Sequence, residues 1–264
     1  DGMVVTVDGT HGRVLAGRME SGKTGGAQTA PVAAVTATAS EVTATKIYVN
    51  VAMPDKAEQA AALDVDGVGL LRAELILEDA LHNRHPRDLI AHGEQDSLVE
   101  SLATAVGRVA AAFSPRPVVY RASDFRTNEF RNLKGGAEFE PEEHNPMIGY
   151  RGCYRYISNP DLFDLELQAL ARVREQNPNL HLMIPFVRTK WELEKCLELV
   201  DASPLGRQRG LHRWVMAEVP SVVYWLPEYV GMGIDGVSIG SNDLTQLMLG
   251  VDRDSDLCAE LYDE

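Results

Sequence analysis

Six short apolar runs, separated by helical stretches, constrain the fold of this chain more than any other feature. The runs are KIYVNV, GVGLLR, PVVYRA, HLMIPF, RWVMAEV and GVSIGS. They are continuous and rich in β-branched residues, as is typical of strands buried on both faces. We expect parallel strands near residues 46–51, 67–72, 117–122, 181–186, 213–218 and 236–241. Helices are expected near residues 54–63, 87–113, 160–176, 190–200 and 220–230.

This alternation of strands and helices predicts an α/β fold with a parallel sheet. A (β/α)8 TIM-type barrel is the natural closure of such a sheet, and a doubly wound open sheet is the alternative. Only six barrel strands are visible in the sequence, so we expect the barrel to lack its last two strands.

The first 45 residues have a different texture. Residues 1–18 predict two short strands around a Gly-rich turn, too little to fold alone, and residues 19–45 predict a linker before a main domain at 46–264. Residues 17–24 match the phosphate-loop pattern G-x-x-x-x-G-K-T letter for letter. A phosphate loop must open a helix, and the Gly, Ala and Thr residues that follow do not favour one. We therefore reject a nucleotide site here.

Charge and cysteine content exclude several classes of function. The formal net charge of −14 opposes binding to nucleic acid, which depends on clustered Lys and Arg. No apolar run approaches the ~18 residues that cross a membrane. Cys153, Cys196 and Cys258 form neither a metal-ligand pair nor a disulfide framework. We interpret all three as structural or incidental and expect a reducing cytoplasm.

Charged residues follow four of the predicted strands directly. Arg72 ends GVGLLR, Arg121 ends PVVYR, Glu218 ends VMAE, and Asn242 and Asp243 end SIGSND. A structural salt bridge would explain any one of them, but burying a charge is costly unless it is paired or used. Because all strands of a barrel open on the same face, we expect these side chains to converge.

The chemistry of this set suits a small anion with a divalent cation. Arg72 and Arg121 can hold a phosphate or a carboxylate through paired hydrogen bonds. Glu218 and Asp243 offer the oxygen ligands that magnesium prefers. Together they would stabilise the negative charge of an enolate or of a phosphoryl group in transfer.

Longer segments carry a family resemblance. They are GVGLLRAE, YRASDFRTNEF, NPMIGYRG, MIPFVRT, AEVPS and SIGSNDLTQLMLGVDRDS. In order and spacing they resemble the barrel domain of the phosphoenolpyruvate-utilising enzymes, over about residues 45–264. This family includes phosphoenolpyruvate synthase (pyruvate, water dikinase), pyruvate phosphate dikinase and enzyme I of the phosphotransferase system. SDFRTNEFRNLKGG, EPEEHNPMIGYRG and HPR are most similar to the synthase.

The resemblance implies a barrel that binds pyruvate and phosphoenolpyruvate (PEP) with magnesium. The reaction implied is ATP, pyruvate and water giving AMP, PEP and phosphate. A dikinase barrel, an enzyme I barrel or a barrel that binds PEP without turnover is the alternative.

Residue by residue, the resemblance implies that Arg72 and Arg121 bind the phosphoryl group and the enolate oxygen. It implies that Glu218 and Asp243 hold magnesium. The further implied contacts are those of Gly240, Ser241 and Asn242 with the substrate, of Arg253 with the phosphoryl group, of Arg151 as outer support, and of Asp124 with an arginine.

The resemblance also implies parts that this sequence does not contain. The phosphohistidine would precede residue 1, with residues 1–18 ending its domain, and the acid/base cysteine would follow residue 264. None of the histidines has the phosphohistidine context, so we interpret His85 and His144 as structural. The implied partners are the phosphohistidine domain of the same protein and a second copy in a homodimer through the barrel.

Overall fold

The computed structural model describes residues 4–8, 13–17 and 43–262 of the chain. Residues 1–43 and 44–264 are two separate compact units, and each is described here by itself. In the first unit, β1 (Val5–Asp8) and β2 (Arg13–Ala16) form an antiparallel pair, with Val5 opposite Ala16. The expected linker at 19–45 and the rejected phosphate loop at 17–24 lie almost wholly outside the described residues.

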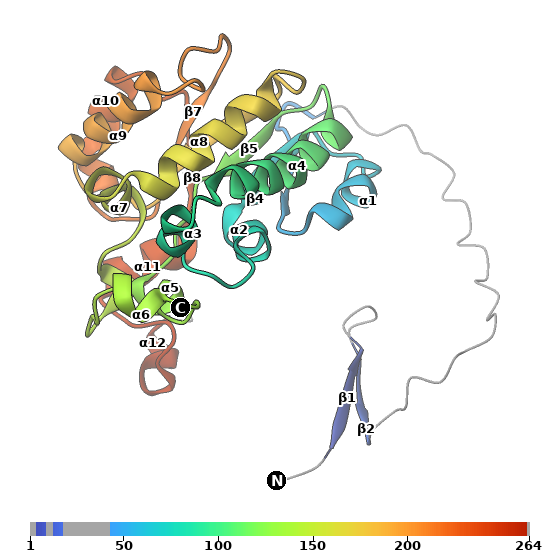
Figure 1. Ribbon diagram of the computed structural model, residues 1–264. Helices are drawn as coiled ribbons and strands as arrows, with labels where there is room; N and C mark the ends of the chain where they lie inside the picture. The colour runs from blue at the N-terminus through green and yellow to red at the C-terminus, as the bar shows by residue number, and fades with distance from the viewer. Residues whose placement is uncertain (1–3, 9–12, 18–42, 263–264) are drawn as a thin grey trace, which may run out of the picture. The chain divides into compact units, whose positions relative to one another are not determined.

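The second unit is built on a curled parallel sheet that forms a half-barrel (Figure 1). Its six strands lie in the order in which they occur in the sequence: β3 (Tyr48–Val51), β4 (Gly67–Arg72), β5 (Val118–Arg121), β6 (Leu180–Ile184), β7 (Arg213–Ala217) and β8 (Gly236–Ile239). All five neighbouring pairs are parallel. The predicted strands are therefore confirmed to within about two residues.

Several helices, among them α4 and α8, cover the outside of the sheet, and others lie at the ends of the strands (Figure 1). The helices of this unit are η1 (Pro54–Lys56), α1 (Ala57–Ala61), α2 (Ala73–Leu81), α3 (Pro86–Ala91), α4 (Gln95–Phe113), α5 (Thr127–Arg131), α6 (Gly136–Phe139), η2 (Pro146–Ile148), α7 (Gly152–Ser158), α8 (Asp161–Arg174), α9 (Lys190–Ala202), α10 (Val222–Gly231), α11 (Ser241–Leu249), η3 (Asp256–Cys258) and α12 (Ala259–Tyr262). In the described part of the chain, none of them is long and apolar enough to cross a bilayer.

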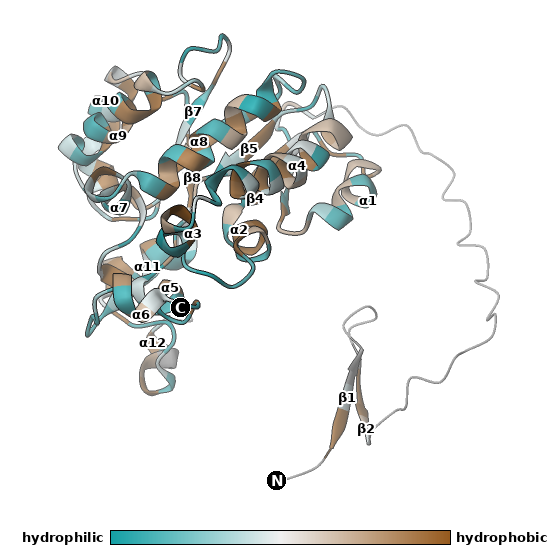
Figure 2. Cartoon of the chain, in the orientation of Figure 1, coloured by the Kyte–Doolittle hydropathy of each residue, from teal (hydrophilic) through white to brown (hydrophobic). Residues whose placement is uncertain are grey.

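The core lies between the sheet and these helices. The middle strand β5 is buried along its whole length, as expected for a strand covered on both faces. Helix α4 buries one apolar stripe, which includes Leu98, Leu102, Val106 and Phe113, the spacing that places side chains on one helix face. In Figure 2, α4 and α8 accordingly carry both hydrophilic and hydrophobic stretches, as helices with one face on the core do.

Two expectations about helices need correction. The single helix expected at 87–113 is two helices, because Gly93 adopts a φ of +73° between them, a left-handed conformation that glycine tolerates best. Several helices were not expected, among them α2, α7 and α11. Helix α2 begins directly after Arg72, without a side-chain cap and without an intervening loop, so its sequence offers no turn signal.

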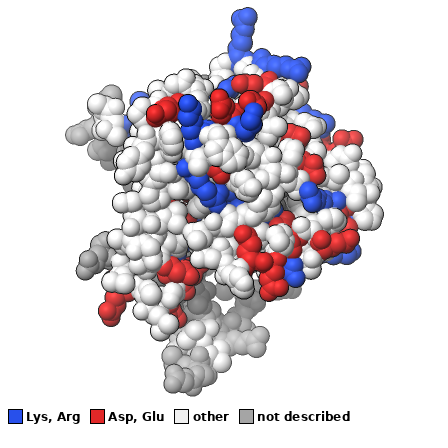
Figure 3. All heavy atoms as spheres, turned by 90° about the vertical axis from the view of Figure 1, so that its left-hand side faces the viewer, with Lys and Arg blue, Asp and Glu red and all other residues white. Residues whose placement is uncertain are grey.

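Acidic and basic side chains are interspersed on the surface. Figure 3 views the side of the domain on which α9 and α10 lie, and basic side chains gather there between groups of acidic ones. Several of these charges form exposed ion pairs, such as that of Lys195 with Glu198 at 2.7 Å. Exposed pairs of this kind contribute little to stability, so the informative charges are the buried ones.

Candidate functional site

A cavity of about 610 Å³ opens at the carboxyl ends of the strands. Parallel strands present their carboxyl ends on one side of a sheet, which is where α/β proteins bind ligands. Its lining includes all eight residues predicted from the sequence: Arg72, Arg121, Glu218, Gly240, Ser241, Asn242, Asp243 and Arg253.

The positions of these residues follow from the chain path. Arg72 and Arg121 are the last residues of the neighbouring strands β4 and β5, paired directly in register. Glu218 follows β7 at once. Gly240 follows β8 and precedes α11, whose first turn includes Asp243. Neighbouring strands thus bring together residues that are far apart in the sequence.

The two arginines at the strand ends differ in how they are held. Arg121 is only 8% exposed, and its Nη2 donates to Glu74 Oε1 at 2.7 Å. Burial disfavours its charge, but Glu74, Asp124 and Glu218 outweigh this and raise its pKa. Its Nε is buried without a hydrogen-bond partner. Arg72 is exposed, and its side chain makes no hydrogen bond or ion pair with any residue that the structure describes. Both therefore have donors available for an anion.

Glu218 is a buried carboxylate with few hydrogen-bond partners. Its side chain is almost fully buried, and its Oε1 accepts one hydrogen bond, from the backbone N–H of Phe186 at 2.7 Å. Burial raises its pKa to about 8, and Asp124 adds to this, although Arg121 lowers it. A carboxylate in this state favours a nearby cation.

Asp243, the second carboxylate, lies between two arginines. Its Oδ1 accepts from Arg151 Nη1 at 3.2 Å, and its Oδ2 forms an ion pair with Arg253 Nη1 at 3.5 Å. Arg151 in turn donates through Nε to Asp124 Oδ1 at 3.0 Å. Arg151 and Asp124 do not line the large cavity. They line an adjacent one of about 290 Å³, which shares Arg72, Arg121, Asp243 and Arg253 with it.

Gly240 allows the backbone after β8 to pass close to the side chain of Glu218. A Cβ atom at this position would lie 2.7 Å from the Cβ of Glu218 and 2.8 Å from its Oε2. Contacts this short exclude any side chain unless Glu218 moves. Glycine is therefore required where the end of β8 passes the carboxylate.

The donor set fits magnesium but not a metal held by protein alone. The described residues include no group of three or more His, Cys, Asp and Glu side chains that could hold an ion. Glu218 and Asp243 line the same cavity. Magnesium is commonly bound by one or two carboxylates and keeps water or substrate oxygens as its other ligands. A buried carboxylate with a raised pKa is a group that such a cation would stabilise.

Sequence reasoning missed Glu74, which contacts Arg121 and also accepts from the backbone N–H of Asp124 at 2.9 Å. Its signal was its place two residues after Arg72, where the first turn of α2 brings it back beneath the strand ends. It also missed Tyr48 and Asn50, which line the cavity from β3. Nothing in their sequence context distinguishes them from ordinary strand residues.

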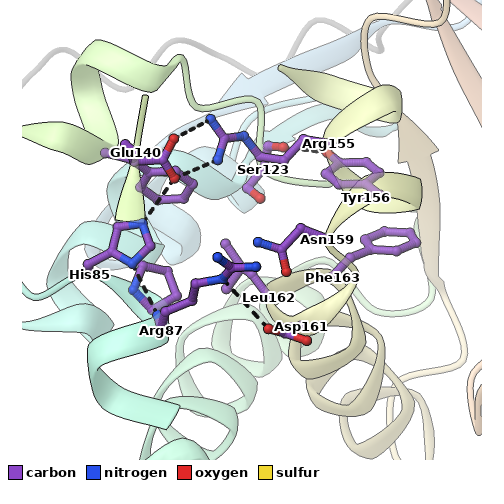
Figure 4. A pocket seen from close by; sticks show the side chains of 12 residues that line it. His85, Arg87, Ser123, Glu140, Arg155, Tyr156, Asn159, Asp161, Leu162 and Phe163 are labelled. Carbon is purple, nitrogen blue, oxygen red and sulfur yellow. Dashed lines mark hydrogen bonds and ion pairs between the residues drawn. The ribbon is translucent and has the colours of Figure 1, made fainter. Parts of the chain in front are cut away.

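His85 belongs to a different cluster, shown in Figure 4. Its Nε2 lies 3.0 Å from Glu140 Oε1, and Arg155 donates to both oxygens of Glu140. Its Nδ1 accepts from the N–H of Arg87 at the start of α3. The cavity beside this cluster is about 20 Å³, room for about one water molecule. His85 is thus held within a closed cluster away from the large cavity.

Comparison with known proteins places this geometry in a family. The sequence model described as "PEP-utilising enzyme, PEP-binding domain" matches residues 26–264. The chain is 45% identical over its whole length to a phosphoenolpyruvate synthase of Aeropyrum pernix, of which it covers 33%. It is 46% identical to a probable phosphoenolpyruvate synthase of Staphylothermus marinus, with the same coverage of both chains. It is 43% identical to that of Pyrococcus furiosus, with all of this chain and 32% of the relative covered.

The chain therefore spans about a third of the length of these relatives. The match of the family model covers the whole second unit and all eight cavity residues named above. From both findings, the chain belongs to the family of PEP-utilising enzymes and corresponds to its PEP-binding domain.

Proposed function

We propose that this chain is the substrate-binding part of a phosphoenolpyruvate synthase, which converts ATP, pyruvate and water to AMP, PEP and phosphate. The observation that carries the proposal is the convergence of two arginines and two buried carboxylates on one cavity at the strand ends. The names of the relatives, which match over the whole chain, support the synthase among the members of the family.

In this proposal the arginines bind the anionic groups of the substrate. Arg72, which has no partner among the described residues, and Arg121, with a buried free Nε, supply donors to the phosphoryl group and the enolate oxygen. Arg253 lines the same cavity and is a further phosphoryl contact. Ser241 and Asn242, in the first turn of α11, line the remaining wall.

Glu218 and Asp243 would hold magnesium. When bound, the ion would supply positive charge to the carboxylate and enolate oxygens of the substrate. The protein orients these two ligands through the N–H of Phe186, which donates to Glu218, and through Arg151, which donates to Asp243. Such second contacts fix the ligand oxygens in place.

Further parts of the proposal concern the longer protein. The curled six-stranded sheet supports an eight-stranded (β/α)8 barrel in the complete enzyme, because a half-barrel with this strand order closes by adding strands at its edges. We also propose that residues 1–18 end a phosphohistidine domain, that this domain delivers the phosphoryl group, that the protein is a homodimer through the barrel, and that it works in the cytoplasm.

Titration calorimetry with oxalate, a planar dianion that resembles enolpyruvate, tests the site. Oxalate should bind in the presence of magnesium, and Asp243→Ala should weaken this binding at least tenfold, about 1.4 kcal/mol. Asp161→Ala is the matched control, since Asp161 lines the small cavity near His85, and it should bind as the unaltered protein does. Equal oxalate affinity with and without magnesium would exclude the proposed ligands.

A second pair of variants tests the arginines. Arg72→Met should weaken the binding of PEP by about tenfold, because one charged hydrogen-bond donor is lost. Arg108→Met is the control: Arg108 pairs with Asp55 and Glu58 on the surface, away from the cavity lining. If both variants bind PEP as tightly as the unaltered protein, Arg72 is not a substrate contact.

A further inference from the structure

Glu166 is a fully buried carboxylate on the inward face of α8. Phe163, Leu167 and Leu170, which share that face, are also buried. A glutamate in such a stripe is costly unless its oxygens accept hydrogen bonds. Within the described residues no Lys, Arg or His forms an ion pair with it. Its hydrogen-bond partners are therefore all neutral groups, and they show which segment of the chain it holds.

Both oxygens of Glu166 bind the segment that follows β5. Oε2 accepts from the hydroxyl of Tyr120 at 2.9 Å and from the backbone N–H of Ser123 at 3.0 Å. Oε1 accepts from the hydroxyl of Ser123. On the other side, the hydroxyl of Tyr156 donates to the carbonyl of Ser123. Ser123 is thus fixed through its side chain, its N–H and its carbonyl.

This segment, residues 122–126, is neither helix nor strand, so the sheet alone does not determine its path. The next N–H group, that of Asp124, donates to Glu74 Oε1 at 2.9 Å. Two carboxylates from different helices, Glu166 on α8 and Glu74 on α2, therefore hold successive backbone groups. Buried carboxylates that hold irregular backbone in this way specify one conformation.

The held segment lies between two groups of the candidate site. Arg121, just before it, lines the large cavity, and Asp124, within it, binds Arg151, which contacts Asp243. We propose that Glu166 is a positioning residue: it holds Ser123 so that Arg121 and the Asp124–Arg151 pair keep the geometry that the ligand requires. The choice of PEP as the ligand rests on the proposed function, but the inference that Glu166 holds Ser123 in place does not.

Protonation of Glu166 provides a readout of this role. Burial raises its pKa to about 7, Glu74 on α2 adds to this, and the hydrogen bonds from Ser123 and Tyr120 oppose it. The other titratable groups that face it are the hydroxyls of Tyr120 on β5 and Tyr156 on α7, whose pKa values burial also raises. Only the ionised carboxylate accepts from all three donors, so Ser123 should be held more firmly above pH 7 than below it.

The test compares Glu166→Gln with Glu192→Gln in the full-length protein. Glu192 is a matched control, because it is also buried and accepts the N–H groups of Arg188 and Thr189, outside the cavity lining. Titration calorimetry with PEP and magnesium should show about tenfold weaker binding for Glu166→Gln at pH 8. The ratio of its dissociation constant to that of the unaltered protein should fall toward 1 at pH 6, because glutamine mimics the protonated form.

Amide hydrogen exchange gives a second arm that needs no ligand. Glu166→Gln and the milder Ser123→Ala should both speed exchange in the peptide over residues 122–126, and Glu192→Gln should not. Unchanged exchange there in both variants, or a loss of PEP binding equal to that of Glu192→Gln, overturns the proposal. If the unaltered protein fails to bind PEP, the proposed function fails, while faster exchange would still support the positioning of the segment.

Discussion

Two buried glutamates in this molecule have opposite electrostatic environments. Glu140 accepts from His85 and from two nitrogens of Arg155, and these partners lower its pKa despite its burial. Glu218 accepts one backbone N–H, and burial raises its pKa to about 8. The first cluster encloses a cavity of about 20 Å³, and the second borders one of about 610 Å³.

The difference separates charges that are paired within the fold from charges that remain available to a ligand. Around Glu140 the charged side chains pair with one another, Arg155 with Glu140 and Arg87 with Asp161. Around Glu218, the nearby Asp243 adds negative charge and Arg72 has no partner among the described residues. Unsatisfied charge at a cavity costs stability and marks a functional site.

The largest expected effect is on the closed cluster. Glu140→Gln should lower the free energy of unfolding by about 3 kcal/mol, because it leaves Arg155 buried without its counter-charge. Since its partners lower the pKa of Glu140, this stabilisation is present above the unfolded value of 4.5 and is lost as the pH falls through the folded value. Urea unfolding should show a larger difference between the two proteins at pH 7.5 than at pH 3.

The second effect concerns Glu166, which has neutral partners only. Its pKa of about 7 in the folded protein lies above the ordinary value of 4.5, so the contribution of Glu166 to stability is largest below pH 4.5 and is lost as the pH rises through 7. Over this range the unaltered protein should lose about 3 kcal/mol relative to Glu166→Gln. If urea unfolding gives the same difference in free energy of unfolding between the two proteins at pH 4.5 and at pH 8, Glu166 does not ionise in a buried site.

A third, smaller effect is expected for Glu218→Gln, which should weaken ligand binding without lowering the free energy of unfolding. Glu218→Gln should weaken magnesium-dependent oxalate binding at least tenfold, about 1.4 kcal/mol. Above pH 8, where Glu218 is ionised, the change should leave the free energy of unfolding unchanged or raised, because an unsatisfied buried charge is removed. Calorimetry and urea unfolding on the same preparation measure both. A variant that unfolds more readily and still binds oxalate would place Glu218 with Glu140 instead.

The smallest effect on stability is expected for Arg72. Its side chain makes no hydrogen bond or ion pair within the described residues, so Arg72→Met should change the free energy of unfolding by no more than about 0.5 kcal/mol. Thermal unfolding without ligand measures this. A clear loss of stability would mean that Arg72 supports the fold, and the contrast with the closed cluster would weaken.

The sequence predicts the strands and the charged residues at their ends, for one physical reason. Strands buried on both faces are continuous apolar runs, and a charge placed directly after such a run is conspicuous, as at Arg121 and Glu218. Parallel pairing then brings the strand ends together without further information. The order of β4, β5 and β7 in the sheet therefore places Arg72, Arg121 and Glu218 at the same edge of the sheet.

The rest depends on contacts that no local pattern shows. Helix α2 begins at Ala73 without a cap, so it merges with the preceding strand in the sequence. Glu166 interrupts the apolar stripe of α8 between Phe163 and Leu167, which was a usable signal. Its partner Ser123, however, lies 43 residues away. Whether a buried carboxylate is satisfied depends on such distant partners, and only the three-dimensional structure shows them.

The order of the strands also bears on how the domain is made. Each strand from β4 to β8 pairs with the strand that immediately precedes it in the sequence. During synthesis, each newly emerged strand with its helix can therefore dock on an edge that already exists, without waiting for a distant segment. The cavity lining is completed late in this order, because Glu218 and Asp243 follow β7 and β8. A nascent chain would thus form the part of the sheet from β3 to β6 before it could bind an anion.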